Sequence, residues 1–267
     1  PMSGNYEFAL AQAKGEWVTI IGDDDAVMPY IFDELDGYCL EFPKINIISS
    51  SRAYYFWAGD EKKYGKAVVS YNCTYEKKIR STKKDLFFAL AGIISCYDMP
   101  QIYTSCIVRR KAIDSIKQKS GGCFYHSIIP DMYSVVALCI EEEEYLRINK
   151  PLFWVGTSNK SMGRSDRVYK DSSRVSQDRE CSIVGISNNV SYKLHSSGFS
   201  SMYLYEALLQ SPRKIFFNEK ILKIIVLASL AFDIKKRTRL NGENINSDLL
   251  IFELKKECKK YNIPIVV

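Results

Sequence analysis

Three consecutive carboxylates, Asp23, Asp24 and Asp25, are the residues of this sequence best suited to chemistry. They follow an apolar run at residues 17–21 and precede Pro29. Acids this close repel one another unless a cation joins them, and carboxylate and phosphate oxygens are the ligands that hard divalent cations prefer. The acids therefore predict a metal site that also binds a phosphate-bearing substrate. They would equally suit a loop that caps the next helix, because Asp is a favoured N-cap.

A second carboxylate, Asp131, follows Pro130 at the start of a helical pattern that ends near residue 143. The apolar positions of this pattern have helical spacing: Met132, Val135, Val136, Cys139 and Ile140. A carboxylate at a fixed helix start could act as a general base toward an acceptor hydroxyl. The partial positive charge of the helix N-terminus would keep it ionised. The alternative is again a simple N-cap.

The elements around these acids predict an α/β protein. Residues 17–21 read as a strand covered on both faces, so that the acids would lie beyond its carboxyl end, where open α/β sheets bind ligands. Ser3 or Asn5 could cap a first helix that Gly15 closes. The remaining patterns predict strands at residues 45–50, 67–71, 101–108 and 145–155, and helices after Pro29, over residues 81–94 and up to residue 119.

Three regions are expected along the chain. Residues 1–165 form the α/β core, residues 166–201 are a polar, Ser-rich linker or lid, and residues 202–267 are mostly helical. The helical region contains an apolar segment, residues 221–232, with basic residues on both sides. This segment is too short to span a bilayer. It predicts either a buried core helix or a helix that lies on an anionic membrane surface.

Composition limits the classes of partner. The 267 residues carry a formal net charge of +6, which suits phosphate-bearing ligands or an anionic membrane. No zinc-finger, RRM or basic-helix signature occurs, so nucleic acid is not an expected partner. The eight cysteines form no C-x-x-C pair and there are two histidines, so a zinc cage is not expected. The cysteines in apolar runs indicate buried thiols in a reducing cytoplasm.

The stretch from Asn5 to Pro29 resembles the centre of family 2 glycosyltransferases, which have the GT-A fold. In that family an Asn-containing helix precedes A-x-G-E-[YW]-[IV], a strand, a DxD motif and a nearby Pro. This sequence has Ala13-Lys14-Gly15-Glu16-Trp17-Val18 at the corresponding place. Counted back from Pro29, the first Asp of the motif falls on Gly22 and the second on Asp24. The resemblance therefore gives the metal to Asp24 first, with Asp25 as a further ligand and Asp23 beside the donor.

The resemblance implies a GT-A-like mixed sheet and an inverting transfer of sugar from a nucleotide-sugar donor to an acceptor hydroxyl. Mn²⁺ or Mg²⁺ would hold the donor diphosphate, and the acceptor would be a saccharide or a lipid-linked saccharide of a cell-surface polysaccharide. A Pro-Asp-x-x-Ser match at residues 130–134, after the loop glycines 121 and 122, carries the base role to Asp131.

Three further residues each have a functional and a plain interpretation. Asn5 would contact the donor or cap the first helix. Arg164 would pair with the diphosphate or belong to an ordinary surface loop. His126 would contact the acceptor or be a packed histidine.

The GT-A fold normally needs two βα units before the acidic strand. Here one predicted helix precedes it, so the sequence is expected to be incomplete at its N-terminal side. Two alternatives to an enzyme follow: a non-catalytic remnant that keeps the acceptor half, and a membrane-associated binding module that acts through the basic helical tail. The expected location is the cytoplasm, either free or at the inner face of the membrane.

Overall fold

The computed structural model describes residues 2–57, 66–69, 75–127, 129–157, 200–212, 218–241 and 247–263. Arg164 with its predicted donor-binding loop lies outside the described residues, as does most of the predicted linker. The predicted α/β class is confirmed, because helices cover a mixed sheet and further helices follow it.

The described strands form one seven-stranded sheet, with the order β1-β6-β3-β7-β2; β4 pairs with β3 and β5 with β7. The long strands β3 and β7 are parallel to each other, and the other pairs are antiparallel. The bounds are β1 (Trp17–Val18), β2 (Ala26–Val27), β3 (Ile47–Phe56), β4 (Ala67–Val69), β5 (Lys77–Ser81), β6 (Cys106–Arg109) and β7 (Glu144–Thr157).

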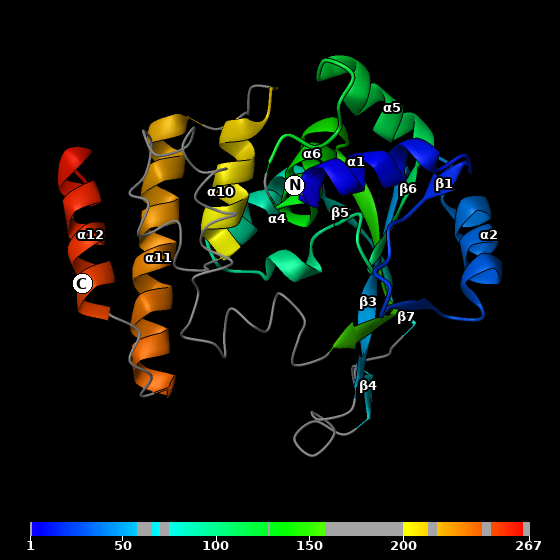
Figure 1. Cartoon of the computed structure of the whole chain (residues 1–267), viewed down its shortest axis with the longest axis horizontal. Coiled ribbons are helices and arrows are strands. Elements are labelled where there is room, and N and C mark those ends of the chain that lie inside the picture. The colour runs from blue at the N-terminus through cyan, green and yellow to red at the C-terminus, as the bar shows by residue number, and fades with distance from the viewer. Residues whose placement is uncertain are drawn as a thin grey trace.

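Helices lie on both sides of this sheet (Figure 1). One side carries α2, the other carries α4 and α6, and α11 and α12 stack beyond α10. The bounds are α1 (Met2–Gln12), α2 (Ile31–Glu41), α4 (Thr82–Leu90), α5 (Arg110–Lys119), α6 (Pro130–Glu141), α10 (Ser200–Gln210), α11 (Glu219–Asn241) and α12 (Ser247–Lys260). A 3-10 turn, η1 (Cys96–Asp98), follows α4.

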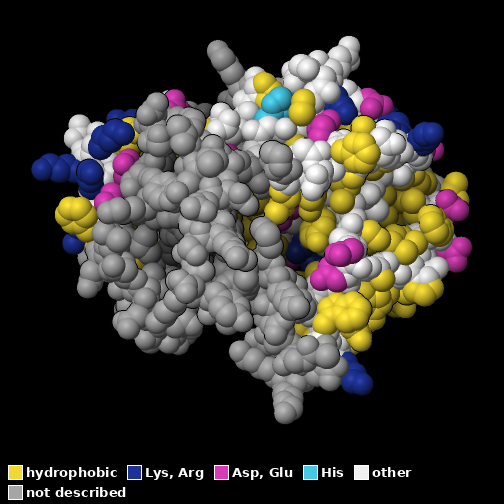
Figure 2. Space-filling model, viewed as in Figure 1, with side chains coloured by type: hydrophobic (Ala, Val, Ile, Leu, Met, Phe, Trp, Pro, Cys, Tyr) yellow, Lys and Arg dark blue, Asp and Glu magenta, His cyan; other side chains and the backbone are white. Residues whose placement is uncertain are grey.

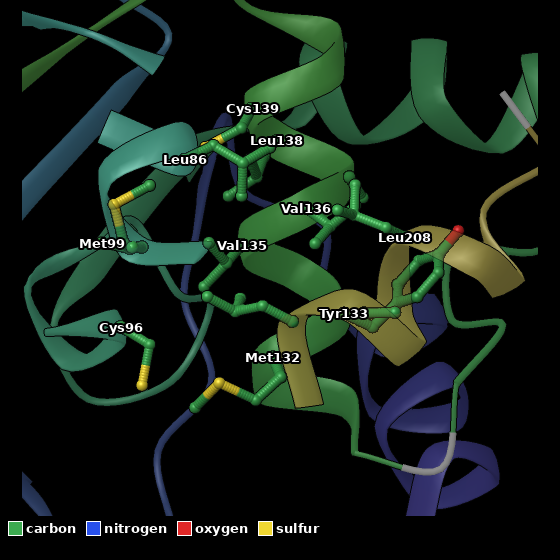
Figure 3. Close-up of a cluster of buried hydrophobic side chains, with 14 of the residues drawn as sticks. Leu86, Cys96, Met99, Met132, Tyr133, Val135, Val136, Leu138, Cys139 and Leu208 are labelled. Carbon is green, nitrogen blue, oxygen red and sulfur yellow. The ribbon is translucent and has the colours of Figure 1, made fainter. Parts of the chain in front are cut away.

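Helix α6 is the centre of the larger hydrophobic core. Its side chains Val135, Val136 and Leu138 are fully buried. Figure 3 shows α6 between Leu86 of α4 and Leu208 of α10. Burial on nearly all sides holds the helix, and therefore the start at Asp131, in one position.

Helix α2 closes a second, smaller core against the opposite face of the sheet. Ile31 and Tyr38 pack there against residues of β3 and β7. Phe32, on the same helix, is 73% exposed. Figure 2 shows hydrophobic side chains gathered over this side of the molecule.

The apolar segment of α11 supplies one face to the larger core. Its buried side chains belong to the same cluster as α6: Leu222, Val226, Leu227, Leu230 and Ile234. Core burial is therefore confirmed for these side chains, while membrane contact by the rest of the helix stays a prediction. No described helix has both the length and the apolar composition needed to cross a membrane.

Strand β1 differs from the predicted buried strand. Only Trp17–Val18 pairs, antiparallel to β6 and at the edge of the sheet. Within residues 17–21 only Val18 is buried, so the prediction of a strand covered on both faces is wrong. After Val18 the chain runs beside residues 104–106 without forming a ladder: Thr19 donates to the Cys106 carbonyl, and the Ile20 carbonyl accepts from the Thr104 N–H. Ile21 is 42% exposed as a result.

Two other predicted elements are shorter than expected. The strand predicted over residues 101–108 begins only at Cys106, because residues 102–104 form a turn. Helix α1 ends at Gln12 rather than at Gly15. It already includes Ser3 and Asn5, so neither residue caps it.

Candidate functional site

The three acids form a tight turn between β1 and β2. The Asp25 N–H donates to the Gly22 carbonyl at 3.3 Å, and the Gly22 N–H donates to Asp25 Oδ2 at 2.7 Å. Asp23 and Asp24 occupy the two corners of this turn. Asp23 is exposed, whereas Asp24 and Asp25 are partly buried.

Asp25 is held by hydrogen bonds on both carboxylate oxygens. Oδ2 accepts the Gly22 N–H, Oδ1 accepts the Gly156 N–H at 2.9 Å, and the Tyr103 hydroxyl donates to the same carboxylate. Much of its capacity to accept is therefore used within the protein. We infer that Asp25 positions the turn, which leaves Asp24 as the carboxylate available to a cation.

The charged form of Asp24 is disfavoured in the described protein. Burial raises the pKa of the Asp24 carboxyl, and the neighbouring Asp25 and Asp23 carboxylates raise it further. A bound cation would relieve this repulsion, because an opposite charge favours the ionised form.

Gly156, near the end of β7, lets this strand approach the acidic turn. A Cβ at this position would lie 1.9 Å from the Asp24 carbonyl oxygen and 2.6 Å from its carbonyl carbon. No side chain fits against backbone atoms at such distances. The glycine thus allows the Gly156 N–H to reach Asp25, and the turn is fixed on the end of the longest strand.

Asp131 lies in the first turn of α6. The N-cap of this helix is Ile129, so the prediction that Asp131 is merely the N-cap is wrong. The Ser134 hydroxyl donates to the Asp131 carbonyl at 2.7 Å and accepts the Ile102 N–H at 3.0 Å. This buried hydroxyl ties the start of α6 to the turn at residues 102–104.

Burial raises the pKa of the Asp131 carboxyl, while the Met132 N–H and the charge of Arg52 act in the opposite direction. Burial is the largest effect, and the expectation that Asp131 is ionised at neutral pH stays a prediction. Arg52, on β3, is itself held by a 2.7 Å hydrogen bond to Gln101 Oε1. The carboxyl is therefore a stronger base than an exposed aspartate.

Tyr103 connects the acidic turn with Asp131. A Cβ on Gly22 would lie 2.8 Å from both the Tyr103 hydroxyl and Asp25 Oδ2, so both oxygens lie beside Gly22. Burial, then Asp25, Asp24 and Asp131, raises the pKa of the Tyr103 hydroxyl. The charges of both predicted acidic sites thus act on one hydroxyl, although more than one hundred residues of sequence separate the two sites.

Tyr6 of α1 lies close to Tyr103. Its ring centroid is 6.0 Å from that of Tyr103, and burial, Asp131, Tyr103 and Asp25 all raise the pKa of its hydroxyl. Tyr125 packs edge-on against Tyr6 at 5.6 Å. Aromatic side chains therefore line the region between the two acidic sites.

The backbone beside Tyr103 is strained. Thr104 has φ 50° and is fully buried. A β-branched residue with positive φ is a genuine outlier, and such strain collects at functional sites. The Thr104 N–H donates to the Ile20 carbonyl at 3.0 Å, so the strained turn is hydrogen-bonded to the segment that precedes the three acids.

Replacing Tyr103 by Phe should loosen the acidic turn without unfolding the protein. The ring would stay packed, but the hydrogen bond to Asp25 would be lost, at a cost of about 1 kcal/mol in stability. We expect the Mn²⁺-dependent affinity for a nucleoside diphosphate to fall about tenfold, as when a residue that positions a metal site is removed. Calorimetric titration measures this affinity. The exposed Tyr75→Phe is the control, and an equal affinity in both variants would contradict the role of Tyr103.

The other predicted site residues have different surroundings. Asn5 is exposed on α1, next to Tyr6. The Nε2 atom of His126 lies 3.1 Å from the Cys123 carbonyl oxygen, and its ring lies 5.7 Å from the Tyr133 ring. His126 is thus a partly buried, packed residue, and its contact with an acceptor stays a prediction.

A divalent cation fits this site only with help from a substrate. No group of three or more His, Cys, Asp or Glu side chains in the described part of the chain is arranged to hold a metal. Mg²⁺ and similar ions are commonly bound through one or two carboxylates together with substrate phosphates. Asp24, with Asp23 at the other corner of the turn, meets that requirement.

The sequence pointed to the acids as candidate site residues, but it did not point to the other residues that lie near them in the structure. Arg52 carried a signal, because it is a lone cation in a run of strand-forming residues. Gly156 also carried one, as a glycine at the end of a long apolar strand. Tyr103 and Tyr6 carried none, since nothing in their neighbouring residues distinguishes them from core tyrosines.

No protein-family model matches this sequence, and no curated protein matches it significantly. The chemistry of the site must therefore carry any assignment of function.

Proposed function

We propose that this chain is a GT-A-like glycosyltransferase that moves a sugar from a nucleotide-sugar donor to an acceptor hydroxyl with the help of Mn²⁺ or Mg²⁺. The proposed acceptor is a saccharide or a lipid-linked saccharide, and the proposed location is the cytoplasm or the inner face of a membrane. The observation that carries the proposal is that the Tyr103 hydroxyl lies beside the acidic turn and that the charges of both acidic segments, residues 23–25 and Asp131, raise its pKa.

The two acidic segments have surroundings suited to different tasks. Asp24 is next to two other carboxylates, so a bound cation would stabilise its ionised form. Asp131 is near Arg52 and is separate from that cluster in sequence, at the rigid start of a buried helix. A donor diphosphate needs a site that holds a cation, as the carboxylates around Asp24 could. An acceptor hydroxyl needs a separate carboxylate that can take its proton, as Asp131 could.

In the proposed reaction Asp24 holds the cation, assisted by Asp23, while Asp25 fixes the turn. When bound, the cation stabilises the negative charge of the leaving diphosphate. Asp131 accepts the proton of the acceptor hydroxyl as this oxygen attacks the sugar. The raised pKa of Asp131 helps, because a general base works best when its pKa approaches the working pH.

Tyr6 and Tyr103 have a positioning role in this proposal. Both are partly buried between the acids, and they reduce the access of water to the reacting atoms. Exclusion of water strengthens each electrostatic interaction in the site and limits hydrolysis of the donor.

Thermal denaturation of the full chain with a panel of nucleoside diphosphates and Mn²⁺ tests the proposal. A ligand at 100 times its Kd stabilises a protein by about 2.7 kcal/mol, which gives a clear rise in melting temperature. We expect such a rise for one nucleotide in Mn²⁺ and its loss in EDTA. If no nucleotide raises the melting temperature, the non-catalytic remnant becomes the better assignment.

A further inference from the structure

A second candidate site lies beside β5, which pairs with the first half of β7, whereas β2 next to the acidic turn pairs with the second half. A cleft of about 310 Å³ is lined by residues of β5, β7 and η1, together with Ile94 and Glu76. We call it the cationic cleft. Its charged lining residues are Lys78, Arg80, Arg147, Glu76 and Asp98.

The charge of Arg80 is already neutralised. Its Nε lies 2.7 Å from Asp85 Oδ2, and the Tyr145 hydroxyl donates to the same carboxylate at 2.8 Å. Asp85 and Tyr145 are buried, so this triad is a fixed part of the cleft wall. The cations left to a ligand are therefore Arg147 and Lys78, beside the carboxylates of Glu76 and Asp98.

Arg147 is a mostly buried guanidinium whose charge is balanced by an exposed carboxylate. Its side chain is 13% exposed and donates to Ser49 Oγ at 3.0 Å and to the Ser50 carbonyl at 2.8 Å. Among the described residues, its one carboxylate contact is Asp98 at 3.2 Å, and the Asp98 side chain is 53% exposed. Burial lowers the pKa of the Arg147 guanidinium, and the nearby positive charges of Arg80 and Arg52 contribute to this decrease.

These contacts suit an anion with several oxygen atoms. A guanidinium presents a planar fork of N–H donors that matches phosphate, and an ammonium group adds a point charge. Lys78 is exposed at the cleft, and the Asn149 side chain also lines it. The volume is at the small end of the range for small-molecule sites.

We propose that the cationic cleft binds a phosphoryl group through Arg147 and Lys78, with Asp98 as the internal carboxylate that the phosphoryl group displaces. The group belongs either to a soluble phosphorylated compound or to a lipid headgroup. This site is separate from Asp24 and Asp131, and it stands whether or not the chain transfers sugar.

Titration of the full chain with inorganic phosphate, followed by calorimetry, tests the proposal. Lys78→Gln should raise the Kd for phosphate about tenfold, because a charge-assisted contact is lost. Asp98→Asn should lower the Kd about threefold, because it removes a competing carboxylate. Both side chains are largely exposed, so both variants should fold, which a thermal melt verifies.

Lys77→Gln is the matched control. Lys77 precedes Lys78 on β5, but its ammonium group pairs with Glu41 and contacts the Tyr38 ring, away from the cationic cleft. The control should bind phosphate as the unchanged protein does. The proposal is overturned if phosphate shows no saturable binding, or if Lys77→Gln and Lys78→Gln weaken it equally.

Vesicles distinguish the two sources of the phosphoryl group. Vesicles of phosphatidylglycerol in phosphatidylcholine should bind the chain in a Lys78-dependent way if the ligand is a headgroup. If only free phosphate shows the dependence on Lys78, the ligand is a soluble compound. Vesicle binding that Lys78→Gln and Lys77→Gln reduce alike, without saturable phosphate binding, would indicate general surface charge and would contradict the site.

Discussion

Asp131→Asn is expected to lower sugar transfer by about 10²-fold or more, the usual contribution of a general base. The amide has nearly the same shape as the carboxylate and can still accept the Met132 N–H, so the start of α6 should be preserved. Donor affinity and melting temperature should change little, because the donor contacts lie in the acidic turn. Turnover and nucleotide affinity are to be measured on one preparation.

The pH dependence of transfer gives a second readout of the same role. A base must be ionised, so wild-type transfer should decline as the pH falls through the pKa of Asp131, which burial raises above the usual aspartate value. Asp114→Asn is the control, because Asp114 is an exposed acid on α5. If Asp131→Asn transfers sugar at the wild-type rate, Asp131 is only structural and His126 is the next candidate base.

Asp24→Asn is expected to abolish most of the Mn²⁺-dependent binding of a nucleoside diphosphate. Loss of an outer-shell partner already costs about 10–100-fold in metal affinity, and loss of a ligand should cost at least as much. Without metal, the melting temperature should hold or rise, because the substitution removes a carboxylate whose charged form burial and its neighbours disfavour. Calorimetric titrations with Mn²⁺ and with EDTA measure the difference.

Asp23→Asn separates the ligand role from simple loss of charge. It removes the same charge from the same turn, but Asp23 is exposed, so its effect should be smaller. Equal losses in the two variants would mean that the turn acts through its total charge. Undiminished Mn²⁺-dependent binding in Asp24→Asn would remove Asp24 from the site.

The sequence predicts the elements with strong periodicity well. Helix α6 and strand β7 were expected within a few residues of their observed bounds, because their apolar spacing is set by burial. The position of β1 at the sheet edge was not predictable, since an apolar run does not say how many neighbours a strand has. The strand expected over residues 101–108 begins late because Thr104 adopts a conformation that its side chain disfavours.

The residues of the candidate site likewise divide into those that local sequence indicates and those that only the folded structure reveals. Asp24 and Asp131 were chosen as candidate residues by their type and position, one beside a turn and the other at a helix start, and their roles stay predictions. Tyr103 was not, because its role depends on a contact with residues far away in the sequence. The tight approach of Gly156 to Asp24 is likewise a property of the packed sheet rather than of any local pattern.

The placement of the acidic turn on β7 has a consequence for local unfolding. Strand β7 pairs with β3 along most of its length and with β5 and β2 on its other side. Its inner amide hydrogens can exchange with solvent only when much of the sheet opens. The turn at residues 22–25 is joined to this strand by the two-residue β2 and the Asp25 bond to Gly156, so it can open at a much lower free energy. Asp24 can thus adjust to a ligand while the strand that carries the turn stays closed.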